Sequence, residues 1–210
     1  MKIVVLGAAT VVGPIIKACG HEIVAVLNDN IPVGQSEGRF VKYNICGTSQ
    51  DIRRYLIGDR KLILTMMTMK DKRGVWDKFV SLNVPDDKFA SVIHPTSIIP
   101  QDGSCKVGCV IMAPLSQLSP GAEIKDNCIL YGNSFIGHDS TLERYVVVAN
   151  NASIQARVHI GRGVHVGSNS TILSGLKIGE FSLIGAGSVV TKDVPPDTIV
   201  AGVPAKPLNK

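Results

Sequence analysis

Two adjacent polar side chains, His138 and Asp139, stand inside a long run of aliphatic and small residues. An imidazole with a pKa of about 6.5 can accept a proton and return it at neutral pH, and a positioned base contributes about 10² to 10⁴ in rate. A neighbouring carboxylate can orient the ring or favour its protonated form. Because adjacency in sequence does not guarantee contact, the pair fits either a catalytic base with its partner or a solvated corner.

The run that surrounds this pair is a six-residue repeat. Three hexads, about 18 residues, close one coil of a triangular prism, so the pattern predicts a parallel β-helix. An all-β sandwich would show variable turn spacing instead. Most residues two positions before each aliphatic are small, such as Ser116, Ala122 and Ser134. The aliphatic residues at steps of six are Leu118, Ile124, Leu130, Ile136, Leu142, Val148, Ile154, Ile160, Val166, Ile172, Ile178, Ile184 and Val190.

Residues 1–92 show a different pattern, in which strand-like and helix-like segments alternate. This alternation predicts a Rossmann-like α/β domain with a parallel sheet over residues 1–92, followed by the β-helix over residues 93–210. The strand-like segments are Lys2–Leu6, Glu22–Leu27 and Lys61–Thr65, with a turn over Gly7–Thr10. The helix-like segments are Val11–Cys19, a short helix capped by Thr48 or Ser49, and Lys70–Leu82.

The composition argues against nucleic-acid and membrane partners. The formal net charge is +5 and the basic residues are scattered, so the sequence indicates no nucleic-acid surface. The apolar opening from Ile3 to Ile16 contains Gly7, Gly13 and Pro14 and is shorter than the roughly 20 residues of a membrane span. We therefore expect neither a signal peptide nor a membrane helix. Five cysteines without a C-x-x-C pair indicate a reducing compartment, and we expect a cytoplasmic protein.

The histidines and cysteines do not predict a metal site. A zinc-dependent hydratase built on the same prism needs three clustered ligands. On such a prism residues 18 apart stack on one edge, but no histidine lies 18 residues from His159 or His165. Cys105 and Cys109 have no second cysteine pair. We therefore expect no metal.

Four motifs make the chain resemble a family of bacterial hexapeptide acyltransferases. They are Val-Leu-Asn-Asp at 26–29, Ile-His-Pro-Thr-Ser at 93–97, Ile-Gly-His-Asp-Ser at 136–140 and Ala-Gly-Val-Pro-Ala-Lys-Pro-Leu at 201–208. The family comprises sialic acid O-acetyltransferase-like proteins and N-acetyltransferases of nucleotide-linked amino sugars, and the resemblance covers essentially the whole chain. It implies a left-handed β-helix, acetyl-CoA as co-substrate, a nucleotide sugar held by the Rossmann-like half, and a homotrimer with active sites between prisms. It also implies His138 as general base, with Asp139 as its acidic neighbour.

Acyl transfer would require further residues around the base. A developing oxyanion needs a fixed donor, and Ala156, 18 residues after His138 on the same edge, would offer its backbone N–H. Glycine permits close backbone approach, and lysine can bind phosphate or simply be a surface charge. The candidate contacts to CoA are therefore Gly185, Ala186, Gly187, Lys192 and Lys206.

Candidate substrate contacts lie at the ends of the first two strands. Gly7 and Ala8 precede a helix whose N-terminus would attract a pyrophosphate. Asn28 and Asp29 end the second strand and are placed to bond a ribose or a base, unless they form an ordinary turn.

The chain also departs from the family pattern. Gly7-Ala8-Ala9 replaces a usual Gly-His-Gly, and Tyr131-Gly132 replaces a usual Asn-Thr, which makes Tyr131 a substrate-binding candidate. Thr65-Met66-Met67-Thr68 stands where Gly-Asn is common, and Val147 stands where a second histidine is frequent. The acceptor pocket therefore looks altered. O-acetylation, another acyl donor, or a non-catalytic nucleotide-sugar-binding relative remain open alternatives.

Overall fold

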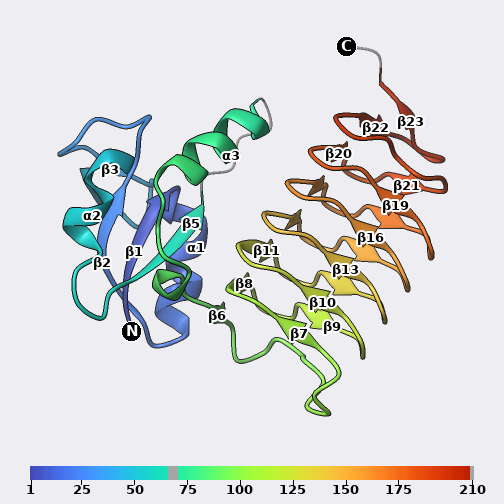
Figure 1. The fold of residues 1–210 in the computed structure, drawn as a ribbon, viewed down its shortest axis with the longest axis horizontal. Coiled ribbons are helices and arrows are strands. Elements are labelled where there is room, and N and C mark those ends of the chain that lie inside the picture. The colour runs from blue at the N-terminus through green and yellow to red at the C-terminus, as the bar shows by residue number, and fades with distance from the viewer. Residues whose placement is uncertain (66–70, 209–210) are drawn as a thin grey trace. The chain divides into compact units, whose positions relative to one another are not determined.

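The computed structural model describes residues 1–65 and 71–208. The chain divides into two compact units, Met1–Val92 and Ile93–Lys210, which are drawn in Figure 1. No helix within the described ranges is long and apolar enough to cross a membrane.

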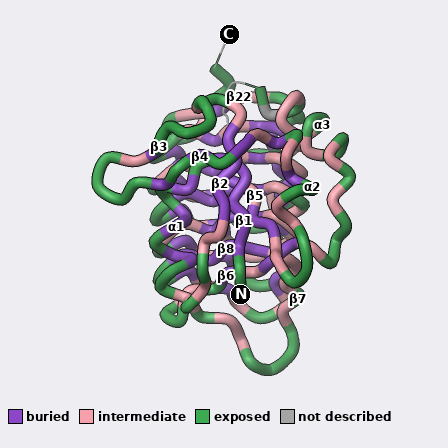
Figure 2. The backbone as a smooth tube through the Cα atoms, turned by 90° about the vertical axis from the view of Figure 1, so that its left-hand side faces the viewer, coloured by how far each residue is buried: buried purple, intermediate pink, exposed green. Residues whose placement is uncertain are grey.

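The first unit contains a five-stranded sheet with the order β3-β4-β2-β1-β5. All neighbours pair in parallel except β3, which is antiparallel to β4. Ile3 to Leu6 of β1 are fully buried, as expected for a central parallel strand covered on both faces, and Figure 2 shows this buried centre. The strands are β1 (Lys2–Gly7), β2 (Glu22–Leu27), β3 (Ser36–Glu37), β4 (Tyr43–Gly47) and β5 (Lys61–Thr65).

The helices of this unit follow the predicted order with shifted ends. Helix α1 begins at Ala9 rather than Val11, because Gly7 continues β1 and Ala8 is the N-cap. Thr48 does cap the next helix, through a capping box with Asp51. The predicted start of α3 at Lys70 and the family departure at Met66–Thr68 lie outside the described residues. The helices are α1 (Ala9–Ala18), η1 (Ser49–Asp51), α2 (Ile52–Tyr55), α3 (Lys72–Ser81) and η2 (Asp86–Lys88).

The second unit coils through three parallel sheets, which we call faces 1, 2 and 3. Strands pair with partners 18 residues away, as Phe135 does with Ser153, so three hexads make one coil as predicted. Face 1 contains β7 (Lys106–Val107), β10 (Glu123–Ile124), β13 (Thr141–Leu142), β16 (His159–Ile160) and β19 (Lys177–Ile178). Face 3 contains β9 (Gln117–Leu118), β12 (Phe135–Ile136), β15 (Ser153–Ile154), β18 (Thr171–Ile172) and β21 (Val189–Val190).

Face 2 is the longest of the three sheets. Its order is β23-β22-β20-β17-β14-β11-β8-β6, and β23 is antiparallel to β22. Its strands are β6 (Val92–Ile93), β8 (Val110–Met112), β11 (Cys128–Leu130), β14 (Val147–Val148), β17 (His165–Val166), β20 (Leu183–Ile184), β22 (Ile199–Ala201) and β23 (Lys206–Pro207).

The core of the coil confirms the six-residue pattern. Every aliphatic residue from Leu118 to Val190 at steps of six is at most 4% exposed. The side chains two positions earlier also point inward, although Leu176 is only partly buried. Asn133 and Asn151 occupy equivalent turns of successive coils and take left-handed φ angles of 57° and 58°. The Asn133 amide donates to the Asn151 side-chain oxygen at 2.9 Å. The repeat therefore sets both the core and the turns.

Candidate functional site

The imidazole of His138 lies in the turn between β12 on face 3 and β13 on face 1. Its Nδ1 is 2.8 Å from Oδ2 of Asp139, and the two side chains are 50% and 63% exposed. In a neutral ring that donates from Nδ1 to this carboxylate, Nε2 is the hydrogen-bond acceptor. The contact that adjacency alone could not establish is therefore present.

Backbone geometry explains why an aspartate can hold the ring. Asp139 has a φ of 57°, a left-handed conformation that aspartate tolerates better than most residues. Its N–H donates to the carbonyl of Pro120 at 3.2 Å, which ties the turn to the preceding coil. The turn thus presents both side chains outward from a fixed backbone.

The amide of Ala156 lies one coil further along the same edge. The N–H of the next residue, Arg157, donates to the carbonyl of His138 at 2.8 Å, which fixes the two turns against each other. The N–H of Ala156 has no acceptor within the described part of the chain. A Cβ on Gly137 would lie 2.6 Å from this nitrogen, so a glycine is needed where the two coils approach each other closely. The edge therefore presents a proton acceptor together with a vacant backbone donor.

The other predicted contacts divide between two edges of the prism. Lys192 follows β21 on the edge between faces 3 and 1, which we call the histidine edge because it carries His138. Tyr131 and Gly185–Gly187 lie between faces 2 and 3, on what we call the glycine edge. Lys206 is exposed on β23, at the end of face 2. A single prism thus does not gather the predicted CoA contacts around the imidazole.

The glycine edge combines an aromatic side chain with open backbone. Tyr131 is half-buried, and this burial raises the pKa of its phenol, which stays neutral at physiological pH. Tyr131 and Gly185 are three coils apart in equivalent turns. Gly187 has a φ of 67° and open space where a Cβ would lie. This edge can therefore receive a ligand close to its backbone.

In the first unit, the polar residues that end β2 are occupied by internal bonds. Asn28 is 7% exposed, its Nδ2 donates to the carbonyl of Gly7 at 3.3 Å, and its Oδ1 accepts from Asn30 N–H at 2.8 Å. Asp29 accepts from the Ser49 N–H at 2.8 Å and pairs with Nζ of Lys78 at 2.8 Å. Burial alone would raise the pKa of Asp29, but the hydrogen bonds from Lys78 and Ser49 outweigh it and lower this pKa.

The N-terminus of α1 holds a carboxylate of the protein itself, from a residue that sequence reasoning did not select. Ala8 is the N-cap of α1 and makes no side-chain capping bond. Instead, Oε1 of Glu37 accepts the N–H of Thr10 at 2.7 Å. Glu37 was missed because it lies 27 residues from Thr10 on a two-residue strand with no recognisable pattern.

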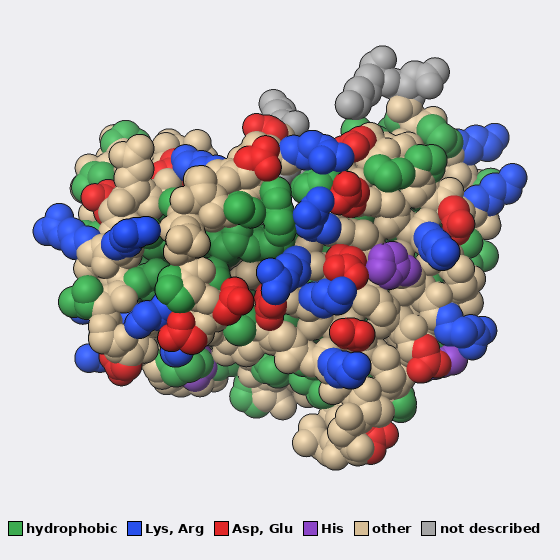
Figure 3. Space-filling view, viewed as in Figure 1, with side chains coloured by type: hydrophobic (Ala, Val, Ile, Leu, Met, Phe, Trp, Pro, Cys, Tyr) green, Lys and Arg blue, Asp and Glu red, His purple; other side chains and the backbone are tan. Residues whose placement is uncertain are grey.

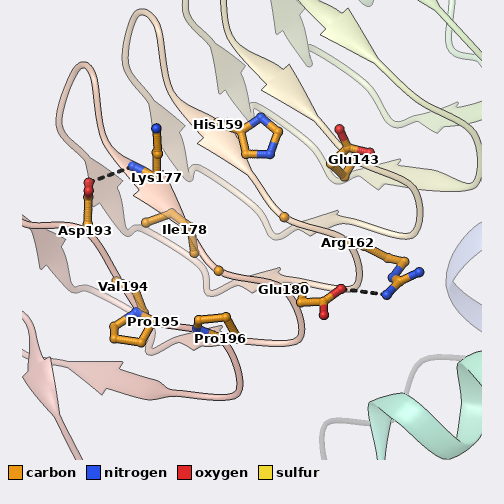
Figure 4. A pocket seen from close by; sticks show the side chains of 12 residues that line it. Glu143, His159, Arg162, Lys177, Ile178, Glu180, Asp193, Val194, Pro195 and Pro196 are labelled. Carbon is orange, nitrogen blue, oxygen red and sulfur yellow. Dashed lines mark hydrogen bonds and ion pairs between the residues drawn. The ribbon is translucent and has the colours of Figure 1, made fainter.

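A charged hollow of about 690 Å³ lies on face 1, and sequence reasoning also missed it. Figure 3 shows side chains of both signs gathered over these coils, and Figure 4 shows the hollow itself. Nη2 of Arg162 pairs with Oε2 of Glu180 at 2.6 Å, and the Lys177 N–H donates to Asp193 at 2.8 Å. His159 also lines the wall. The spacing of 18 between Arg162 and Glu180 was the available signal.

No cluster suited to a metal ion was found within residues 1–65 and 71–208. A group of three histidine, cysteine or acidic side chains would be required, and none is present there. His159 and His165 belong to strands on different faces.

Comparison with known proteins agrees with the coiled architecture. Residues 157–192 match the family described as bacterial transferase hexapeptide (six repeats). The matched residues lie within the second unit, whose coils carry a six-residue repeat. Galactoside O-acetyltransferase of Escherichia coli is 34% identical to this chain over 87 residues, which cover 41% of this chain and 43% of that protein. The chain spans less than half the length of the curated relatives it matches.

Two solved structures share the fold over essentially the whole chain. PerB from Caulobacter crescentus, in complex with CoA and GDP-perosamine, superposes with a TM-score of 0.82 at 21% identity and covers 100% of this chain and 98% of PerB. The acetyltransferase domain of PglB from Neisseria gonorrhoeae, in complex with acetyl coenzyme A, gives a TM-score of 0.79 at 21% identity, with 99% and 98% covered. At such identities the likeness establishes the fold.

Proposed function

We propose that this protein is a cytoplasmic, acetyl-CoA-dependent N-acetyltransferase of a nucleotide-linked amino sugar, built on a left-handed β-helix and a Rossmann-like domain. The observation that carries the proposal is the exposed His138–Asp139 pair beside the vacant N–H of Ala156. The shared fold adds support, because PerB was solved with CoA and GDP-perosamine.

In the proposed reaction, Nε2 of His138 removes a proton from the sugar amine as nitrogen attacks the thioester carbonyl. The C–N bond forms, the C–S bond breaks, and the proton on His138 passes to the departing sulfur. Asp139 holds Nδ1–H through its 2.8 Å contact and stabilises the imidazolium that forms transiently. The chain thus returns to its starting protonation state after each turnover.

Ala156 would stabilise the charge that develops on the carbonyl oxygen. A backbone N–H held by neighbouring coils does not reorganise during the reaction, and removal of one such donor typically costs about 10² to 10³ in rate. Its position one coil from His138 places the donor on the same edge as the base. The amide therefore suits an oxyanion better than a mobile side chain would.

We propose that the active site is completed by a neighbouring subunit of a homotrimer. The outward residues of the described strands of face 3 carry no charge: they are Gln117, Phe135, Ser153, Thr171 and Val189, all half-buried. The corresponding positions of face 1 include Lys106, Glu123 and Lys177. Depletion of charged residues is typical of the centre of an interface. A cyclic arrangement would bring the histidine edge of one prism against the glycine edge of the next.

The proposal is tested by mixing the purified protein with acetyl-CoA and a panel of UDP-, GDP- and dTDP-linked amino sugars. Release of free thiol together with a mass increase of one acetyl group on the sugar is expected. Binding of a nucleotide sugar without thiol release would instead support a non-catalytic relative.

O-acetylation is the second candidate, and one comparison favours it. The Escherichia coli relative is named galactoside O-acetyltransferase. Matched acceptors with a hydroxyl in place of the amine separate the two reactions, since only one of each pair would gain the acetyl group. Other acyl-CoA donors can be screened in the same assay.

A further inference from the structure

Glu37 is the only charged side chain among the buried residues of the described chain, with 7% exposure. Its carboxylate lies where β1 and β2 end, because it contacts Thr10 just after β1 and Asn28 just after β2. In open sheets built from parallel strands, ligands bind outside these carboxyl ends. Glu37 is therefore a buried acid at the sheet edge where a ligand would bind.

The two carboxylate oxygens of Glu37 receive hydrogen bonds of unequal length. Oε1 accepts from the Thr10 N–H at 2.7 Å, which is a strong bond, but the contact from Asn28 Nδ2 to Oε2 is 3.4 Å. The same Nδ2 also donates to the carbonyl of Gly7 through its other N–H. The ion pairs found in the described part of the chain do not include Glu37. A carboxylate oxygen can accept about two hydrogen bonds, and Oε2 receives only the 3.4 Å contact from Asn28. Because a buried charge is costly unless donors surround it, a further donor from a ligand would be favourable at Oε2.

A second buried polar group lies beside it. Tyr43 is the cross-strand partner of Glu37 in the β3–β4 pair and is 6% exposed. Its hydroxyl has no hydrogen-bond partner among the described residues and lies against Gly13, where a Cβ would come within 2.2 Å of it. Beside the first half of α1, the Oε2 atom of Glu37 can therefore accept a further hydrogen bond, and the hydroxyl of Tyr43 can donate one.

The chemistry of this place excludes a phosphate and favours a hydroxyl donor. A helix N-terminus normally attracts anions, but the Thr10 N–H is already used by Glu37, and a phosphate there would face a carboxylate. The carboxylate of Asp29, which ends β2, is already bound by Ser49 and Lys78. Glu37 is therefore the acid at this edge that has room for a donor.

Resting on the proposed function, we infer that Glu37 accepts the 2′-hydroxyl of the substrate's ribose and selects ribonucleotide-linked over deoxyribonucleotide-linked sugars. The diphosphate then lies away from the N-terminus of α1. A site built to bond a hydroxyl discriminates strongly against an analogue that lacks it, because the buried acceptor is left unpaired.

The test is calorimetric binding of UDP against 2′-deoxy-UDP, and of GDP against 2′-deoxy-GDP, to the full chain. The wild-type protein should bind the ribonucleotides about tenfold or more tightly than their deoxy forms. Glu37→Gln should reduce this preference to about threefold or less, since a neutral amide is the weaker acceptor. Glu22→Gln, at an exposed position in the same unit, should keep the full preference.

Equal affinity of the wild-type protein for the ribo and deoxy forms would overturn the inference without any variant, so a folding defect in Glu37→Gln cannot obscure the result. A preference retained in a folded Glu37→Gln would overturn it too, as would no binding of any of the four nucleotides. The proposed function is judged separately by acetyl transfer: thiol release can persist while the ribose preference is absent.

Discussion

Nδ1 of His138 and Oδ2 of Asp139 lie 2.8 Å apart in one turn of the coil, although both side chains are half or more exposed. Because both side chains are solvent-exposed, this contact contributes little to stability and is better explained by the orientation it gives to the ring. It leaves Nε2 directed away from the carboxylate. The first two predictions follow from this relationship.

Replacement of His138 by alanine should lower turnover by at least about a hundredfold, because a general base contributes about 10² to 10⁴ in rate. Since the ring is exposed, the thermal midpoint should change little. Steady-state thiol release and a melting curve measure the two effects. His159→Ala, an exposed histidine on face 1, is the matched control and should retain full turnover. An unchanged rate in His138→Ala would remove the residue from the proposed role.

Asp139→Asn and Asp139→Ala separate the charge of this residue from its backbone conformation. Asparagine tolerates a φ of 57°, so Asp139→Asn should reduce turnover by about tenfold or more with little loss of stability. Alanine should reduce turnover similarly and also destabilise the fold by about 1–2 kcal/mol, because its left-handed conformation is strained. Turnover and urea unfolding of both variants provide the comparison. Full activity in Asp139→Asn would contradict the orienting role.

Phe135→Glu should dissociate the trimer and abolish acetyl transfer together. The side chain is half-buried at an outward position of face 3, and a buried unpaired charge would destabilise an interface there. Light scattering after size exclusion would measure the mass. Lys106→Glu on face 1 should leave the mass unchanged. Active monomers of Phe135→Glu would show that each prism works alone.

Ile136→Ala should cost about 2–5 kcal/mol of unfolding free energy, because this fully buried side chain leaves a cavity in the coil. Leu173→Ala should cost far less, since Leu173 is 42% exposed in the turn that follows β18. Urea denaturation of both variants gives the difference. Similar losses in the two would indicate that Leu173 is covered in the assembled protein.

The thiol of Cys128 should make the fold sensitive to alkaline pH. Burial raises its pKa from 9.0 to about 12, so the unfolded chain loses this proton more readily than the folded chain does. The stabilising contribution is complete below pH 9.0 and should decline as pH rises towards 12, by about 1.4 kcal/mol per unit. Urea unfolding at pH 8 and at roughly pH 10.5 measures it. Cys128→Ala should show a smaller decline over this range.

Much of the architecture was predictable from local patterns. A period of six places one aliphatic side chain of each hexad inside the prism, so burial from Leu118 to Val190 follows directly from the sequence. Strands β1, β2 and β5 were predicted because continuous apolar runs mark strands with buried residues. By contrast, β3 and β4 were missed, since β3 has only two residues and β4 alternates buried with exposed positions, so neither forms a continuous apolar run.

The sequence by itself determined the coil, its buried residues and the adjacency of His138 and Asp139, because each depends on neighbours within one or a few hexads. Only the tertiary structure decided that the imidazole of His138 contacts Asp139, and that Glu37 reaches Thr10 from 27 residues away. The physical reason is that burial follows a local period. Contacts between polar groups depend on which segments, distant in sequence, are brought together by the fold. A single polar residue forms no repeating pattern from which such a contact could be predicted.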